Sequence, residues 1–282
     1  MEPNAIHTPY DGSSKPFTIG LKALDIREWL DRDEHFETYI AEKRRLYVEE
    51  TANVLVAEGD TDDAQSEVLD LISETLGKFA EQYETEALGP LARAALMVQE
   101  DLVLMRHSPY GWRLVAASLC FPSAWKLHEK FGKPLHEIHQ PVPGFGEGTR
   151  NAGLIDRMFD NLRVEQPVIR WNWSLYGDAE LYHPASDNKM KNRFGEGKID
   201  GRVILRLERQ TLCKLPKSGD ILFTIRIYNN PIEVLKNHAA GAELAQAIMA
   251  QLSAMTPEQL DYNGLLDEVP KLMTRLSELA QR

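Results

Sequence analysis

The sequence predicts an α+β fold, in which a five-stranded antiparallel sheet lies between helical extensions at both ends. Apolar residues in the first third of the chain recur with helical spacing, five later segments are rich in β-branched and aromatic residues, and the final segment returns to helical spacing. We expect an N-terminal arm and helical extension over residues 1–100, a sheet domain over 101–230, and C-terminal helices over 231–282 that pack on the same body.

Composition limits the classes of function. The chain has 282 residues, of which 43% are hydrophobic and 27% charged, as is ordinary for a globular protein. A net charge of −11 argues against a general binder of nucleic acid or of a membrane surface. Cys120 and Cys213 are too few for a disulfide scaffold and form no CxxC pair. With neither a signal-peptide pattern nor a long apolar run, we expect a cytoplasmic protein.

The N-terminal third is predicted to be an arm followed by helices. Residues 1–20 are rich in Pro, Gly and Ser, and Tyr10, Phe17 and Ile19 are placed to pin this arm to the body. Asp25 is the expected N-cap of a short helix that buries Trp29. Apolar positions spaced between charges then predict helices over 34–58, 66–83 and 90–99.

Five segments are predicted strands: 102–106, 113–119, 168–175, 203–212 and 220–228. Short turns at 109–111 and 214–219 join the first two and the last two, so each pair should form a hairpin. A helix over 148–162 lies between the hairpins, and helices over 231–252 and 256–279 close the chain. Thr256 and Gln259 form a capping-box pattern with Pro257 at the first helical position.

The order of hairpin, helical crossover and three further antiparallel strands is that of a PAS-like sheet with helices over one face. Such a concave sheet leaves a ligand pocket beneath its helices. The alternative that the pattern leaves open is an ordinary α+β sandwich without a pocket.

The segment 118–143 holds the residues best suited to bind a ligand. Ser123 is the expected cap of a short helix over 124–131, and a second turn over 134–138 brings His136 and His139 close together. Two prolines at 141 and 143 stiffen the backbone after His139, which suits an axial or metal ligand. The alternative is that His139 only bonds a carbonyl or caps the helix.

Three of the predicted strands carry charged residues where core strands are usually apolar. Arg170 and Asn172 alternate with Trp171 and Trp173, and Arg206, Glu208 and Arg226 occupy alternating positions on the last two strands. If both faces of the sheet are covered, then Arg170, Asn172, Glu208 and Arg226 form a buried polar cluster that marks a functional site. If one face meets water, they are a solvated surface. We expect Glu208 and Arg226 to face each other across the hairpin.

Other motifs are weak. The glycines in PGFGEG (143–148) resemble a phosphate loop, but no strand leads into them, so we expect a flexible loop that walls the pocket. Asp178, Glu180, His183 and Asp187 suggest a metal site, although irregular spacing favours a solvated loop.

Several blocks together resemble the family of haem-dependent oxidative N-demethylases. These blocks are PF-x-I-GL-x-x-LD-x-x-x-WL (16–30), CFPSAW (120–125), IHQPVP (138–143), RWNWSL (170–175), LERQTLCKLP (207–216) and ILFTIRIY (221–228). They appear in order over about residues 16 to 255, and the chain resembles the haem-bearing catalytic subunit, the alpha-type subunit.

The resemblance implies a PAS-like domain that holds haem b and uses O2 to demethylate a small secondary amine such as dimethylamine, releasing formaldehyde. It also implies NADPH, FMN and a 2Fe-2S cluster on reductase subunits, and tetrahydrofolate on a folate-binding subunit. Haem needs an apolar cavity and an axial ligand. His139 is our candidate for the metal ligand, with Cys120 and His136 behind it.

The resemblance also assigns roles to the strand residues. Glu208, Arg226, Arg170 and Asn172 become candidate substrate and proton-delivery groups, Trp171 and Trp173 candidate walls of the haem site, and Arg226 a candidate partner for a haem propionate. The competing hypothesis is a PAS-like haem or small-ligand sensor without catalysis. A haem monooxygenase is favoured because no signalling module follows the sheet domain.

Overall fold

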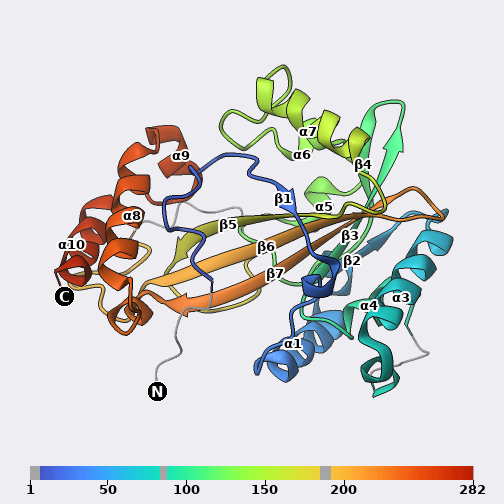
Figure 1. Cartoon of the computed structure of the whole chain (residues 1–282), viewed down its shortest axis with the longest axis horizontal. Helices are drawn as coiled ribbons and strands as arrows, with labels where there is room; N and C mark the ends of the chain where they lie inside the picture. The colour runs from blue at the N-terminus through green and yellow to red at the C-terminus, as the bar shows by residue number, and fades with distance from the viewer. Residues whose placement is uncertain (1–6, 83–87, 185–191, 282) are drawn as a thin grey trace.

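A seven-stranded antiparallel sheet organises the chain in the computed structural model (Figure 1). The structure describes residues 7–82, 88–184 and 192–281. The strands lie side by side in the order β1-β5-β6-β7-β3-β4-β2, and each neighbouring pair is antiparallel. Their bounds are β1 Lys22–Ala23, β2 Leu55–Ala57, β3 Asp101–Ser108, β4 Gly111–Ser118, β5 Val168–Tyr176, β6 Ile204–Lys214 and β7 Ile221–Pro231.

The five predicted strands are all present, as β3 to β7, and both predicted hairpins are confirmed. The predicted count of five is wrong, because β1 and β2 add one short strand at each edge. The segment 34–58, expected to be one helix, instead ends as β2, where Leu55 pairs with Ser118 of β4. Edge strands of two or three residues are too short for an alternating pattern to identify them.

Several helices differ from the predicted ones. The helix predicted over 231–252 is a short 3-10 helix, Ile232–Lys236, followed by an α-helix that begins only at Gly241. The capping box of Thr256 and Gln259 is present, but the closing helix predicted over 256–279 is divided into two helices. The α-helices are α1 Phe36–Glu49, α2 Thr51–Val54, α3 Asp62–Leu76, α4 Pro90–Ala95, α5 Leu127–Lys130, α6 Leu135–Ile138, α7 Arg150–Asn161, α8 Gly241–Ala254, α9 Pro257–Tyr262 and α10 Val269–Ala280; the 3-10 helices are η1 Ile26–Glu28, η2 Gly77–Gln82 and η3 Ile232–Lys236.

Strand register divides the sheet into two faces. The first face carries Asn172, Glu208 and Ile227, which are opposite one another on β5, β6 and β7, and the second face carries Trp173, Leu207 and Tyr228. Residues from α1, α5, α6 and α7 pack in the core cluster on the first face. Residues from α3, α4, α8 and α10 pack in two clusters on the second. Both faces are therefore covered, as a buried polar cluster requires.

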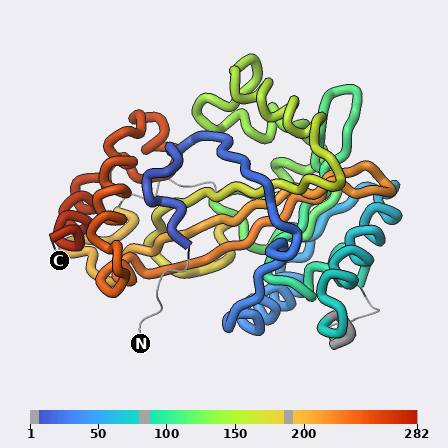
Figure 2. The backbone as a smooth tube through the Cα atoms, viewed as in Figure 1, coloured from blue at the N-terminus to red at the C-terminus, as the bar shows by residue number. Residues whose placement is uncertain are grey.

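The N-terminal arm links the two ends of the molecule. Figure 2 shows it running from beside the C-terminal helices, over the strands, to β1. Tyr10 is fully buried against the C-terminal helices, whereas Phe17 and Ile19 pack on the cluster of the first face. The three predicted anchors of the arm are confirmed.

In the part of the chain that the structure describes, none of the helices combines the length and the apolar character needed to cross a membrane.

Candidate functional site

A cavity of about 310 Å³ opens on the first face of the sheet. Its floor is β5 and β6, its walls are the segment from Leu119 to Phe159, and residues 14–21 of the arm and Tyr262 at the end of α9 complete its rim. This volume lies at the lower end of the range of about 300–1,000 Å³ typical of small-molecule and cofactor sites. The predicted pocket is therefore present, and the alternative of a sandwich without a pocket is wrong.

Most of the wall is apolar. It is built by alternate residues of β3, β6 and β7, by the exit from β4, and by α6 and α7, and includes Val103, Phe121, Ile138, Phe145, Phe159 and Ile225. Phe145 belongs to the glycine-rich loop, so the prediction that this loop walls the pocket is confirmed. An apolar wall of this kind suits a flat hydrophobic cofactor better than a small charged metabolite.

His139 lies at the C-terminal end of α6 and borders the cavity. Its backbone N–H and its ring Nδ1 both lie 2.9 Å from the carbonyl oxygen of Leu135. Since a carbonyl only accepts, Nδ1 carries the proton and Nε2 keeps its lone pair. Among the described residues Nε2 has no hydrogen-bond partner. A backbone carbonyl on one imidazole nitrogen is the usual way in which proteins orient a histidine that binds metal through the other.

The imidazole of His139 is neutral at physiological pH. Burial, followed by the positive charges of Lys130 and Arg170, lowers its pKa from 6.5 to about 4, although the bond to Leu135 opposes this. Metal binds the neutral form of histidine. The site therefore needs no deprotonation step before it can bind iron.

Glu208, Arg170 and Asn172 all line the cavity from the neighbouring strands β6 and β5, as the sequence predicted for these three. Glu208 and Asn172 are directly opposite each other on β6 and β5, and Gln210 donates a hydrogen bond of 2.6 Å from Nε2 to Oε2 of Glu208. Glu208 is only 8% exposed, which excludes the alternative of a solvated sheet face at this position. Arg170 donates from Nη2 to the carbonyl oxygen of Thr18 in the arm at 3.3 Å.

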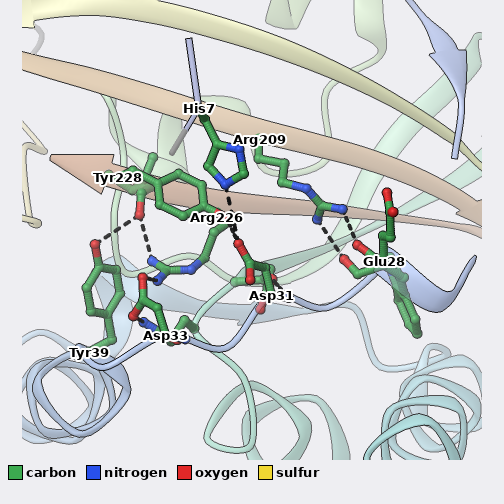
Figure 3. Close-up of polar contacts among 12 residues, drawn as sticks. His7, Glu28, Asp31, Asp33, Tyr39, Arg209, Arg226 and Tyr228 are labelled. Carbon is green, nitrogen blue, oxygen red and sulfur yellow. Dashed lines mark hydrogen bonds and ion pairs between the residues drawn. The ribbon is translucent and has the colours of Figure 1, made fainter. Parts of the chain in front are cut away.

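Arg226 lies elsewhere, and the predicted pairing with Glu208 across the hairpin is wrong. Register places Ile227 opposite Glu208, and Arg226 opposite Arg209 on the second face. The Arg226 guanidinium is fully buried, forms an ion pair of 2.7 Å with Asp33, and stacks on Tyr39 (Figure 3). It is absent from the cavity lining found among the described residues. Its contacts fix the segment before α1 against β7.

Trp171 and Trp173 border the cavity, but their rings pack with the hydrophobic cluster of the second face. The Trp171 ring centroid lies 4.6 Å from that of His7, and Trp173 Nε1 donates to Gln251 Oε1 at 3.3 Å. These contacts tie the arm and α8 to β5. The two tryptophans therefore stabilise β5, which forms part of the cavity floor, through contacts on the second face of the sheet.

The alternative ligands are placed less favourably than His139. Cys120 is fully buried in the core, and burial raises the pKa of its thiol, so it is protonated at neutral pH. A thiol binds iron as the thiolate. Neither Cys120 nor His136 is among the described residues that line the cavity.

The other predicted metal candidates do not form a cluster. His183 Nε2 lies 3.2 Å from Asp178 Oδ1, and Asp187 lies outside the described residues. Within residues 7–82, 88–184 and 192–281, no group of three or more His, Cys, Asp or Glu side chains is arranged to hold a metal ion.

Two buried charges, not assigned any role from sequence, hold the ligand-bearing segment in place. Asp101 accepts hydrogen bonds of 2.8 Å from the backbone N–H groups of Cys120 and Phe121. Arg206 donates to the carbonyl oxygens of Phe121 and Leu181, at 3.0 and 3.1 Å. The predicted helix cap at Ser123 is wrong: α5 begins only at Leu127, and Ser123 Oγ accepts from Arg206 at 3.1 Å.

Sequence reasoning also missed Lys130, Tyr176 and Tyr262, which line the cavity from α5, β5 and α9. Lys130 lies within the segment 118–143 that the sequence analysis singled out. Its nearness to Trp125 in the sequence could have suggested a contact between the two side chains, and in the structure Lys130 Nζ lies 4.2 Å from the centre of the Trp125 ring. Tyr262 is brought in from a distant helix and gives no local signal. Burial, followed by the charge of Glu208, raises the pKa of Tyr262 to about 12, so its hydroxyl stays protonated.

The chain matches a family model described as haem-dependent oxidative N-demethylase, alpha subunit-like. Two matches cover residues 20–89 and 77–265, and so include the cavity walls from β5 to β7, α6 and α9. The candidate site residues from Cys120 to Arg226 lie within these matches, as do all the blocks of the resemblance except residues 16–19 of the first one. This chain belongs to the family of haem-dependent oxidative N-demethylase alpha-subunit-like proteins.

Proposed function

We propose that this chain is the haem-binding catalytic subunit of an oxidative N-demethylase, with His139 as the axial ligand of haem b. The observation that carries the proposal is the setting of His139. Its Nδ1 is fixed by the Leu135 carbonyl, its ring is neutral, and it borders a largely apolar cavity. Family membership supplies the reaction class, and the geometry supports one particular ligand.

The residues present fit haem b. One neutral imidazole offers its Nε2 for the iron, and the apolar walls suit a porphyrin ring. Bound haem would supply the activation of O2 that oxidation of an N-methyl group needs. The arm and α9 are placed to restrict the access of water to this site, and the PAS-like arrangement of β3 to β7 would provide its concave floor.

Glu208 is the residue best placed to bind the substrate. A small secondary amine such as dimethylamine is protonated at neutral pH, and Glu208 is the one carboxylate among the described residues that line the cavity. We propose that Glu208 and Asn172 orient the ammonium group, and that Glu208 accepts a proton when the free amine is formed. Tyr262 would remain a neutral hydroxyl beside it.

The balance of the reaction requires partners. Removal of one N-methyl group consumes O2, two electrons and two protons, and yields the shorter amine, formaldehyde and water. We propose that the electrons come from NADPH through FMN and a 2Fe-2S cluster on reductase subunits. A folate-binding subunit carrying tetrahydrofolate would take up the formaldehyde. The alpha-subunit-like family supports an assembly with further subunits. We propose that this assembly lies in the cytoplasm.

The test is the optical spectrum of the purified protein and of His139→Ala. The wild type should show a Soret band that shifts with carbon monoxide, and His139→Ala should retain little haem while His136→Ala keeps it. Full haem occupancy with an unchanged spectrum in His139→Ala would refute the ligand assignment. Haem binding without turnover of any secondary amine, even with a competent electron donor, would favour the sensor alternative.

A further inference from the structure

The cavity wall carries more positive than negative charge. Lys130 reaches it from α5 and Arg170 from β5, whereas Glu208 is the single carboxylate among the lining residues that the structure describes. Lys15 adds a third positive charge, but this side chain belongs to the exposed arm at the rim. The inner wall therefore holds two cations but only one anion.

Neither inner cation has an ion-pair partner within the described parts of the chain. Arg170 makes one long hydrogen bond, of 3.3 Å, to the Thr18 carbonyl, and its Nε is buried without a partner. Lys130 Nζ stacks on Trp125 at 4.2 Å. Burial lowers the pKa of both groups, and the charge of Glu208 only partly opposes this. Charges away from water and without ion-pair partners are unfavourable, so the site is suited to a bound anion in addition to Glu208.

The ligand required by the proposed function brings two such anions. Haem b carries two propionate carboxylates at one edge of an otherwise apolar ring. The largely apolar cavity lining has two cations, and both lie close enough to Glu208 for its charge to act on them. We propose that Lys130 and Arg170 bind the haem propionates, which replaces the role that Arg226 was expected to have. This inference rests on the proposed function, because it identifies the residues that orient the haem.

The two cations are suited to different contacts. The planar guanidinium of Arg170 can bind one carboxylate through two parallel hydrogen bonds, whereas the ammonium of Lys130 acts as a point charge. They come from α5 and β5, so binding of one haem joins the crossover segment to the sheet. The other anion with this chemistry is a carboxylate on the substrate itself, such as that of an N-methyl amino acid.

The experiment compares haem with its dimethyl ester, in which both propionates are neutral. Apoprotein is titrated with each porphyrin in the same detergent-containing buffer, and Kd is obtained from the Soret band. The variants are Lys130→Met and Arg170→Met, with Lys133→Met and Arg163→Met as exposed controls outside the cavity lining. Far-UV circular dichroism melts show whether each variant is folded.

The wild type should bind haem at least about tenfold more tightly than the ester, the scale of a hydrogen bond to a charged group. Each cavity variant should lose roughly tenfold in haem affinity but keep its ester affinity within about twofold, and both controls should match the wild type. The comparison of haem with its ester uses the wild-type protein alone, so a folding defect in a variant cannot affect that part of the test.

Equal affinity of the wild type for haem and ester would overturn the inference while leaving the haem site intact. Equal loss of both affinities in Lys130→Met and Arg170→Met would also overturn it. If haem affinity is unchanged in these variants but the KM of a carboxylate-bearing amine rises, the cations bind substrate and the inference is wrong. If the wild type binds neither porphyrin, the proposed function fails as well.

Discussion

The buried imidazole of His139 should make the stability of the apoprotein depend on pH. Burial and the charges of Lys130 and Arg170 lower the pKa of His139 from 6.5 to about 4. A histidine with a lower pKa in the folded than in the unfolded state binds more protons when the chain unfolds. The stability it contributes is therefore fully present above pH 6.5 and is lost as pH falls toward 4.

The magnitude follows from the two pKa values. The difference between 6.5 and about 4, at 1.36 kcal/mol per pH unit, corresponds to about 3 kcal/mol over the whole range. Between pH 7.5 and pH 5 the loss attributable to His139 is about 2 kcal/mol, because the folded imidazole is still mostly neutral at pH 5 while the unfolded one is protonated. This is a large share of the stability of a typical domain, about 5–15 kcal/mol.

Urea unfolding of haem-free protein at the two pH values measures this loss. The free energy of unfolding of His139→Gln should fall by about 2 kcal/mol less than that of the wild type between pH 7.5 and pH 5. His136→Gln, on the same turn but outside the cavity lining, should follow the wild type, and groups titrating elsewhere cancel in the comparison. Equal falls in the wild type and His139→Gln would refute a buried, neutral imidazole.

Two further predictions concern the supporting and the catalytic charges. Arg206→Met leaves buried carbonyls without donors and should lower the free energy of unfolding by about 3–5 kcal/mol, as for a broken buried charge network. Arg202→Met, an exposed control in the turn before β6, should cost less than about 0.5 kcal/mol in the same urea titration. Glu208→Gln should reduce amine turnover by roughly 10²-fold or more with unchanged haem content. Glu165→Gln, in the exposed loop before β5, is its control; normal turnover in Glu208→Gln would remove Glu208 from catalysis.

The five long strands, β3 to β7, were predictable because they are long enough to show alternation and β-branched composition. The edge strands were not, because β2 continues an amphipathic helical segment and is defined only by its pairing with β4. Ser123 shows a similar limit. The local sequence favours a helix cap at Ser123, but in the structure the Ser123 hydroxyl accepts a hydrogen bond from the Arg206 guanidinium. Ala124 adopts a positive φ of 61°, which is not helical, and α5 begins only at Leu127.

The place of His139 at the cavity could be predicted because its signal is local, whereas its role as a metal ligand stays a prediction. The turn of α6 directs both its backbone N–H and its Nδ1 to Leu135, and the prolines that follow fix the exit of the chain. Lys130 and Tyr262 could not be assigned in the same way. They reach the cavity from α5 and α9, and only the packing of these helices on the sheet brings them near Glu208.

Three arginines with nearly identical local sequence settings show what long-range packing decides. Each lies within a strand between apolar neighbours, so alternation alone gives each the same prospect of a functional role. Arg206 is satisfied by carbonyl oxygens of the loops that pack over it, and Arg226 by Asp33 on the second face. Arg170 faces the cavity with a single long hydrogen bond. The first two are committed to holding the fold, so Arg170 is the one whose guanidinium remains available to bind a ligand.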